Sequence, residues 1–228
     1  MANIFKTSIG KKLIMSISGL FLIFFLCIHA SVNLLYLFGD EWFQAGCDFM
    51  SLHIVTIIVP VLAAGFIVHI IWAFILYYQN YKARGKERYA VATKTKTEDW
   101  ASRNMIVLGL LVLIGIALHL TDFWVNMQYK EVVLGEEAAK GPELMRQTFS
   151  CIWVYVLYVV WFIVLWFHLT HGFWSAFHTI GWSNEKWIKR LKVIGIIFVT
   201  ILVVIFIAVA TKGYLDAHCC NIAAACGA

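Results

Sequence analysis

Histidines within apolar segments are the residues of this chain best suited to chemistry. The segment WFHLTHGFWSAFH, residues 166–178, holds three imidazoles among aromatic side chains. Across the whole sequence, five histidines lie inside apolar runs: His29, His69, His119, His168 and His171. An imidazole in hydrocarbon is costly unless it is hydrogen-bonded or bound to a metal, so such residues are functional candidates.

The other three histidines have a simpler explanation. His53, His178 and His218 stand at the ends of apolar runs or in the C-terminal tail, where water or lipid headgroups satisfy their nitrogens. One buried histidine is also explained by a hydrogen bond between two helices. Buried histidines in four separate apolar runs favour a shared role as ligands.

The composition defines the elements that must position these side chains. The 228 residues are 62% hydrophobic and 14% charged, with a mean hydropathy of +0.81, which excludes an ordinary soluble domain. A bilayer core about 30 Å thick needs about 20 apolar residues per helix. Five runs meet this length, at about residues 13–38, 52–78, 105–127, 149–177 and 191–210. They are continuous rather than alternating, so we expect an all-α bundle of five transmembrane helices forming one membrane domain, residues 1–228.

The basic residues predict the orientation of this bundle. Most of the 18 lysines and arginines lie in the N-terminal segment and in the second and fourth connections between runs. Since basic loops stay in the cytoplasm, we expect a cytoplasmic N-terminus and a C-terminus on the outer, periplasmic side. The first run is too long for a secretory signal and is expected to remain as a span. The net charge of +5 therefore requires no nucleic acid as a partner.

Counting along the predicted helices sorts four histidines into two depths. At about 1.5 Å per residue, His29 lies about 16 Å from the outer polar boundary, and His119 lies closer to it. The same count places His69 and His168 about 27 and 33 Å from that boundary, in the inner half. We therefore expect an outer pair, His29 with His119, and an inner pair, His69 with His168.

Two imidazoles per level match the needs of haem iron. A zinc site uses about four protein ligands, or three and water. A porphyrin occupies four positions of its iron and leaves two axial positions, and helical bundles admit such a ring. The sequence has no Cys-x-x-Cys-His motif, so two non-covalently held haem b groups are predicted. With both axial positions filled, electron transfer is the chemistry that remains, and a membrane quinone is the expected carrier.

The residues around these histidines resemble one membrane protein family. The stretches are GLFLIFFLCIHASVN, CDFMSL, ALHLTDFW and FHLTHGFWSAFHTIGW, together with the single histidine of the second run. They are similar to the five-helix, dihaem cytochrome b anchor subunit of succinate dehydrogenase (succinate:quinone oxidoreductase) and quinol:fumarate reductase. The resemblance implies axial ligands at His29 and His119 for the outer haem and at His69 and His168 for the inner haem. It assigns His171 to packing or to support of a ligand, because Gly172 follows His168 at the family's spacing.

The resemblance also implies partners and a location. Such a subunit lies in the bacterial cytoplasmic (inner) membrane and binds an iron–sulfur subunit and a flavoprotein with FAD, and the whole complex can form a dimer. Menaquinone is the expected quinone, and no dicarboxylate site is evident in this chain. Residues 82–103 and 183–192 would form the docking face, although membrane topology explains their charges equally well.

Further polar residues are candidates for contacts with the cofactors. A quinone needs a nearby proton acceptor, and the candidates are Asn33, Glu41, Asp48 and Asp122, each of which also suits a solvated helix end. Ser16 and Arg103, with Trp100, are candidates for the inner haem propionates. An interfacial aromatic and basic belt is the alternative for Trp100. In some fumarate reductases of the family a glutamate stands two residues before the fourth ligand, where this chain has Trp166, so we expect no proton path of that kind.

Some alternatives stay open at this stage. The chain could be the cytochrome b of a membrane hydrogenase or formate dehydrogenase, because His168 and His171 place two imidazoles on one helix. A non-redox transporter with a histidine proton relay is a third hypothesis. Glycines near the histidines, such as Gly115 and Gly172, would admit a flat ring, although small residues also pack membrane helices together. Three cysteines follow the last run on the side where disulfides form: Cys219, Cys220 and Cys226.

Overall fold

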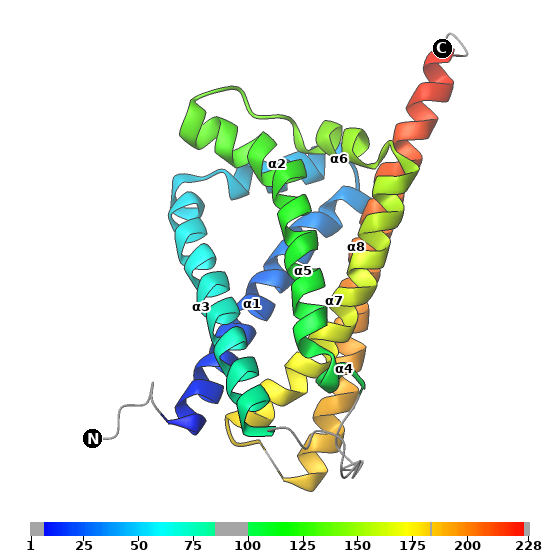
Figure 1. The fold of residues 1–228 in the computed structure, drawn as a ribbon. Helices are drawn as coiled ribbons and strands as arrows, with labels where there is room; N and C mark the ends of the chain where they lie inside the picture. The colour runs from blue at the N-terminus through cyan, green and yellow to red at the C-terminus, as the bar shows by residue number, and fades with distance from the viewer. Residues whose placement is uncertain (1–6, 85–99, 183, 226–228) are drawn as a thin grey trace.

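The computed structural model describes residues 7–84, 100–182 and 184–225, and within these ranges it is all-helical, without strands (Figure 1). The predicted all-α class is confirmed. The long elements are α1 (Ser8–Leu34), α3 (His53–Arg84), α5 (Met105–His119), η3 (Leu120–Leu134), α7 (Ile152–Thr179) and α8 (Glu185–Ala225). The short elements are η2 (Leu35–Leu37), α2 (Asp40–Met50), α4 (Trp100–Arg103) and α6 (Gly141–Phe149).

Within the described ranges, five segments are long and apolar enough to cross a membrane, as predicted, so by length and composition the chain is a multi-pass membrane protein. They are Ile9–Leu37, Val55–Ala83, Met105–Leu134, Ile152–Thr179 and Glu185–Cys219. The third segment joins α5 to the π-helical turns of η3. The last segment begins earlier and ends later than the predicted run 191–210, because charged and polar residues at both ends continue the helix α8.

The bundle has two ends, which we name from their place in Figure 1. The lower end holds the start of α1, the end of α3, α4, the end of α7 and the start of α8. The upper end holds α2, η3, α6 and the C-terminal part of α8. The predicted cytoplasmic side corresponds to the lower end. Residues 85–99, which form most of the predicted basic docking segment, lie outside the described residues.

The helices pack around α7 and α8, which form the most extensive contact in the bundle. The helix α1 crosses diagonally and contacts α3, α7 and α8, while α5 packs on α7 (Figure 1). The buried core follows one face of α8, where Val199 is fully buried and Leu202, Phe206 and Ala210 continue the same stripe. The helix α3 packs mainly on α1, and its apolar surface is otherwise largely exposed.

Two short helices that the sequence analysis treats as connections cover the upper end. The helix α2 starts after Gly39, whose φ of 141° suits glycine, and α6 has Pro142 in its first turn. The backbone N–H of Gly141 donates to Gln44 Oε1 at 3.0 Å, which joins the two helices. Arg146 and Asp40 form a salt bridge at 2.7 Å between them. Together, α2 and α6 tie the long helices to one another at this end.

Candidate functional site

The upper half of the bundle brings His29 and His119 together. His29 lies on α1 and His119 is the last residue of α5, and their ring centroids are 5.6 Å apart with the planes at 86°. Aromatic rings surround the pair, with Phe206 5.9 Å from His29 and Trp161 6.0 Å from His119. The pair therefore lies in an aromatic environment between four helices.

The lower half brings His69 and His168 together in the same manner. His69 lies on α3 and His168 on α7, with ring centroids 6.4 Å apart and planes at 68°. The two pairs contain one histidine from each of four membrane-crossing segments. These are the partners that the depth count predicts.

The helices that supply each pair meet through their side chains. Among the described residues, neither α1 with α5 nor α3 with α7 forms an extensive backbone contact. The imidazoles therefore extend from separated backbones toward a common point. This is the arrangement needed for a group bound between two helices.

A glycine on the neighbouring helix faces each imidazole of the lower pair. A Cβ added to Gly19 of α1 would lie 3.4 Å from His69 Cε1, and one added to Gly109 of α5 would lie 3.6 Å from His168 Cε1. The helix backbones thus approach the Nδ1–Cε1 edge of each ring. Nε2 of each ring lies farther than 4 Å from the added Cβ, so the glycine is nearer to Nδ1 than to Nε2.

The donor set of each pair fits the axial positions of a haem. Two imidazoles bound to one metal atom through nitrogens at about 2 Å would have ring centres roughly 6 Å apart, close to the separations of both pairs. In residues 7–84, 100–182 and 184–225, no group of three or more histidine, cysteine, aspartate or glutamate side chains is placed to hold a metal ion. Each pair therefore supplies two protein ligands. His168 Nδ1 is buried without a hydrogen-bond partner in the described part of the chain.

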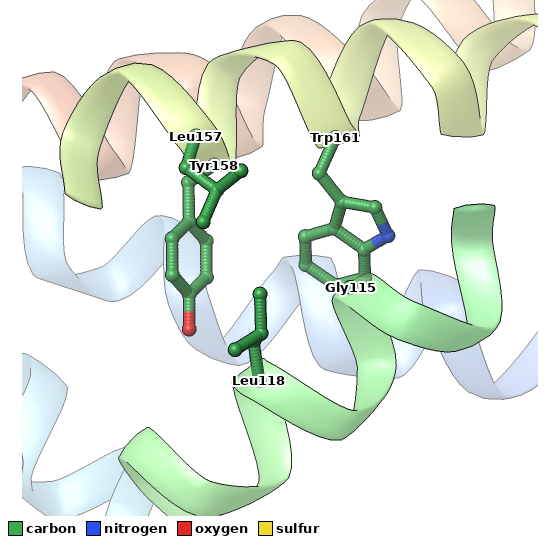
Figure 2. Close-up of a pocket in the computed structure, with 5 residues that line it drawn as sticks. All are labelled: Gly115, Leu118, Leu157, Tyr158 and Trp161. Atoms are coloured by element: carbon green, nitrogen blue, oxygen red, sulfur yellow. The ribbon is translucent and has the colours of Figure 1, made fainter. Parts of the chain in front are cut away.

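The space beside the upper pair is small. A cavity of about 10 Å³ lies between α5 and α7, lined by Gly115, Leu118, Leu157, Tyr158 and Trp161 (Figure 2), and it has room for about one water molecule. The indole of Trp161 covers Gly115, and its Nε1 donates to the carbonyl oxygen of Val112 at 3.2 Å. Gly115 therefore allows close packing of Trp161 from α7, which agrees with the helix-packing alternative for this glycine rather than with admission of a ring cofactor. No atom lies within 4 Å of a Cβ added to Gly172.

Among the four quinone candidates, Asp122 and Asn33 lie nearest to the upper pair. Asp122 Oδ2 accepts a hydrogen bond of 2.7 Å from the Tyr158 hydroxyl, and the Tyr158 ring is 6.5 Å from His119. Asn33 Nδ2 donates to the carbonyl oxygen of His29 at 2.8 Å. Glu41 and Asp48 are exposed on α2 and take no part in the hydrogen bonds of Asp122 and Asn33. Tyr158 was not among the predicted site residues, because a tyrosine in an apolar run cannot be distinguished by sequence from the other aromatic residues there.

The propionate candidates lie at the lower end but differ in burial. Ser16 is buried and Arg103 is exposed. The exposed ring of Trp100 packs on Phe167, next to His168, with centroids 5.4 Å apart. Sequence reasoning missed Ser18, whose Oγ lies 3.2 Å from His69 Nδ1. The sequence offered no signal that singles out Ser18, because its contact depends on the rotation of α1 against α3.

Other singled-out residues have structural contacts. The ring of His171 packs edge-on against Trp174 at 5.1 Å. Trp166 Nε1 donates to Thr200 Oγ1 at 2.9 Å, which links α7 to α8. Cys219 is an exposed free thiol, whereas the side chain of Cys220 and all of Cys226 lie outside the described residues.

Comparisons of the chain with family models, with curated protein sequences and with solved structures give no match. The class of the protein thus comes from its fold and its site. In the described residues it is an all-helical, multi-pass membrane protein with two facing pairs of histidines at two levels of the bundle.

Proposed function

We propose that the chain is the dihaem b anchor and electron-transfer subunit of a succinate:quinone oxidoreductase or quinol:fumarate reductase. The observation that carries the proposal is the pair of facing imidazoles at each of two levels, drawn from four different membrane-crossing segments. In this proposal, His29 and His119 hold one haem, and His69 and His168 hold the other.

Each haem, when bound, supplies a one-electron redox centre inside the hydrocarbon region. The chain's own residues fix the position of that centre. The histidines would hold each haem from two helices, and the aromatic side chains around His29 and His119 would exclude water from it. The two levels provide successive positions for an electron along the bundle.

The upper end is the proposed place of quinone chemistry. Quinone reduction consumes protons as well as electrons, and quinol oxidation releases them, so a side chain that can donate and accept protons is required near the redox centre. Asp122 with its donor Tyr158 meets this requirement best, because both lie beside His119. Leu118 and Leu157, which line the small cavity beside Tyr158, are exposed on the bundle surface and would face the lipid that holds the quinone.

The lower end is the proposed docking place of the partner subunits. Exposed cations line the start of α8 at this end, including Lys186, Lys189 and Arg190. An iron–sulfur subunit bound here would exchange electrons with the lower pair, and the FAD-containing subunit would carry the dicarboxylate reaction. The proposed location is the bacterial cytoplasmic membrane, with menaquinone as the carrier.

The direct test is to purify the complex from its native membrane and record reduced-minus-oxidised absorption spectra. We expect a b-type spectrum, two haems per copy of this chain, and co-purification of an iron–sulfur subunit and a flavoprotein. A colourless preparation would reject the redox role and favour a transporter. A co-purifying nickel or molybdenum subunit would instead favour a hydrogenase or formate dehydrogenase.

A further inference from the structure

Ser18 is the one side chain of the lower site that hydrogen-bonds a candidate ligand in the described part of the chain. Its Oγ is 3.2 Å from His69 Nδ1 and 3.0 Å from the carbonyl oxygen of Met15. Ser18 is 8% exposed, so water does not compete freely for either contact. The three groups form a short hydrogen-bonded chain from the imidazole of α3 to the backbone of α1.

Both contacts of Ser18 can be hydrogen bonds at the same time in only one arrangement of protons. A serine hydroxyl has one proton and a carbonyl oxygen can only accept, so in that arrangement Ser18 donates to the carbonyl oxygen of Met15. Ser18 Oγ then accepts from a proton on His69 Nδ1. A neutral imidazole protonated at Nδ1 presents an unprotonated Nε2, which is the form that binds a metal. A Cβ added to Gly19 would lie 3.4 Å from Cε1 and 3.7 Å from Nδ1 of the same ring, with Nε2 farther than 4 Å, so Gly19 lies on the Nδ1 side of His69.

We propose that Ser18 is a positioning residue that holds His69 in its metal-binding tautomer and makes it a stronger ligand than His168. An acceptor for the distal N–H of a ligating histidine raises the basicity of the ligand and stabilises the oxidised metal. His168 has no such acceptor, because its Nδ1 is buried without a hydrogen-bond partner among the described residues. Ser18 therefore lowers the reduction potential of the lower haem. The inference rests on the proposed function.

The test is a potentiometric titration of the purified complex with Ser18→Ala. We expect the midpoint potential of one haem to rise while the other stays unchanged, and the affinity for the lower haem to fall by about 10- to 100-fold. Ser18→Thr keeps the hydroxyl and should preserve both values. The matched control is Ser31→Ala. Ser31 is also on α1 and donates to the carbonyl oxygen of Cys27, but its side chain is exposed on the surface.

The outcomes separate this inference from the proposed function. A wild-type complex without haem refutes the proposed function before any variant is made. A wild-type complex with two haems and Ser18→Ala potentials equal to wild type refutes the role of Ser18 alone. Equal shifts in Ser18→Ala and Ser31→Ala also refute it, because they would reflect a general disturbance of α1. If Ser18→Ala loses the lower haem altogether, retention of that haem by Ser18→Thr supports the inference, and its loss from both variants contradicts it.

Discussion

At the scale of single residues, the ligand assignment gives the most direct prediction. His69→Ala removes one of the two proposed ligands of the lower haem, so the purified complex should retain one haem per chain. His53→Ala is the matched control on α3, because His53 is exposed at the start of the same helix. Haem content measured by pyridine haemochrome absorbance checks both variants. Equal loss of haem in the two variants would contradict the assignment.

Tyr158 gives a second residue-scale prediction, for the quinone end. Tyr158→Phe removes the hydroxyl that donates to Asp122 and keeps the ring, so we expect both haems to remain and quinone-dependent turnover to fall. A hydrogen bond to a charged group contributes about 1.5–3 kcal/mol, and its loss can lower the rate by about an order of magnitude. Turnover is measured with a soluble quinone analogue.

The control for this variant is Tyr155→Phe, one turn earlier on α7. The hydroxyl of Tyr155 contacts Thr211 of α8 at 3.0 Å and is therefore directed away from Asp122. Turnover of Tyr155→Phe should match wild type. If both variants lose turnover equally, the Tyr158–Asp122 pair has no special role.

The sequence predicted the paired histidines but missed the residues that support them. Histidines are conspicuous in an apolar run, and depth along a helix follows from counting. Ser18 and Tyr158 are common residues of membrane helices, and their importance depends on the rotation of one helix against another. Counting along a single helix does not determine that rotation, so these contacts required the structure.

At the scale of helices, the close approach of α5 and α7 gives a stability prediction. A Cβ added at Gly115 would lie 2.0 Å from Trp161 Nε1, so Gly115→Ala must displace the indole and break its hydrogen bond to Val112. Such overpacking costs about 1–3 kcal/mol. Thermal unfolding in detergent should show a lower midpoint for Gly115→Ala. In the Trp161→Leu background there is room for the added methyl group, so Gly115→Ala should lower the unfolding midpoint less than it does in the wild-type protein. An equal lowering in both backgrounds would argue against this contact.

The contact of α2 with α6 gives another prediction at this scale. Cys47 of α2 is buried against Gly141 of α6, and burial, followed by the negative charge of Asp48, raises the pKa of its thiol to about 12. Thiol reagents react with the thiolate, so Cys47 should resist alkylation at pH 8 in the folded protein and react after denaturation. Mass spectrometry of the alkylated peptides distinguishes the two states. Rapid labelling of Cys47 in the folded protein would show that α2 does not pack on α6.

The sequence predicted the long helices better than the short ones. Continuous apolar runs leave few alternatives to a helix in a membrane, because each backbone polar group needs a partner. The helices α2 and α6 mix polar and apolar residues, and their helical state depends on contacts such as that of Gln44 with Gly141. The π-helical turns of η3 follow His119 without a proline or glycine to mark them.

At the scale of the whole molecule, the two ends of the bundle differ in the contacts that their charged and aromatic side chains make. The upper end has a network in which the buried Tyr36 donates to Asp216 and Lys212 lies over the Tyr36 ring, joining η2 to α8. At the lower end, cations lie over aromatic rings: the exposed Arg190 over Trp187 and the partly buried Lys192 over Trp174. The cations at the lower end suit the proposed docking of partner subunits there, and the network at the upper end fixes η2 on α8.

The orientation of these ends in the membrane is the last prediction. If the lower end is cytoplasmic, as the basic residues predict, exposed thiols at the upper end face the periplasm. Cys151, between α6 and α7, and Cys219, in the C-terminal part of α8, are exposed at this end. Variants that keep one of them as the only cysteine should react with a membrane-impermeant maleimide added to intact spheroplasts. A single cysteine introduced as Lys186→Cys at the lower end should react only after the membrane is permeabilised. The reverse pattern would place the proposed docking face outside the cell, where it could not meet a cytoplasmic flavoprotein, and would overturn the proposed assembly even if both haems are present.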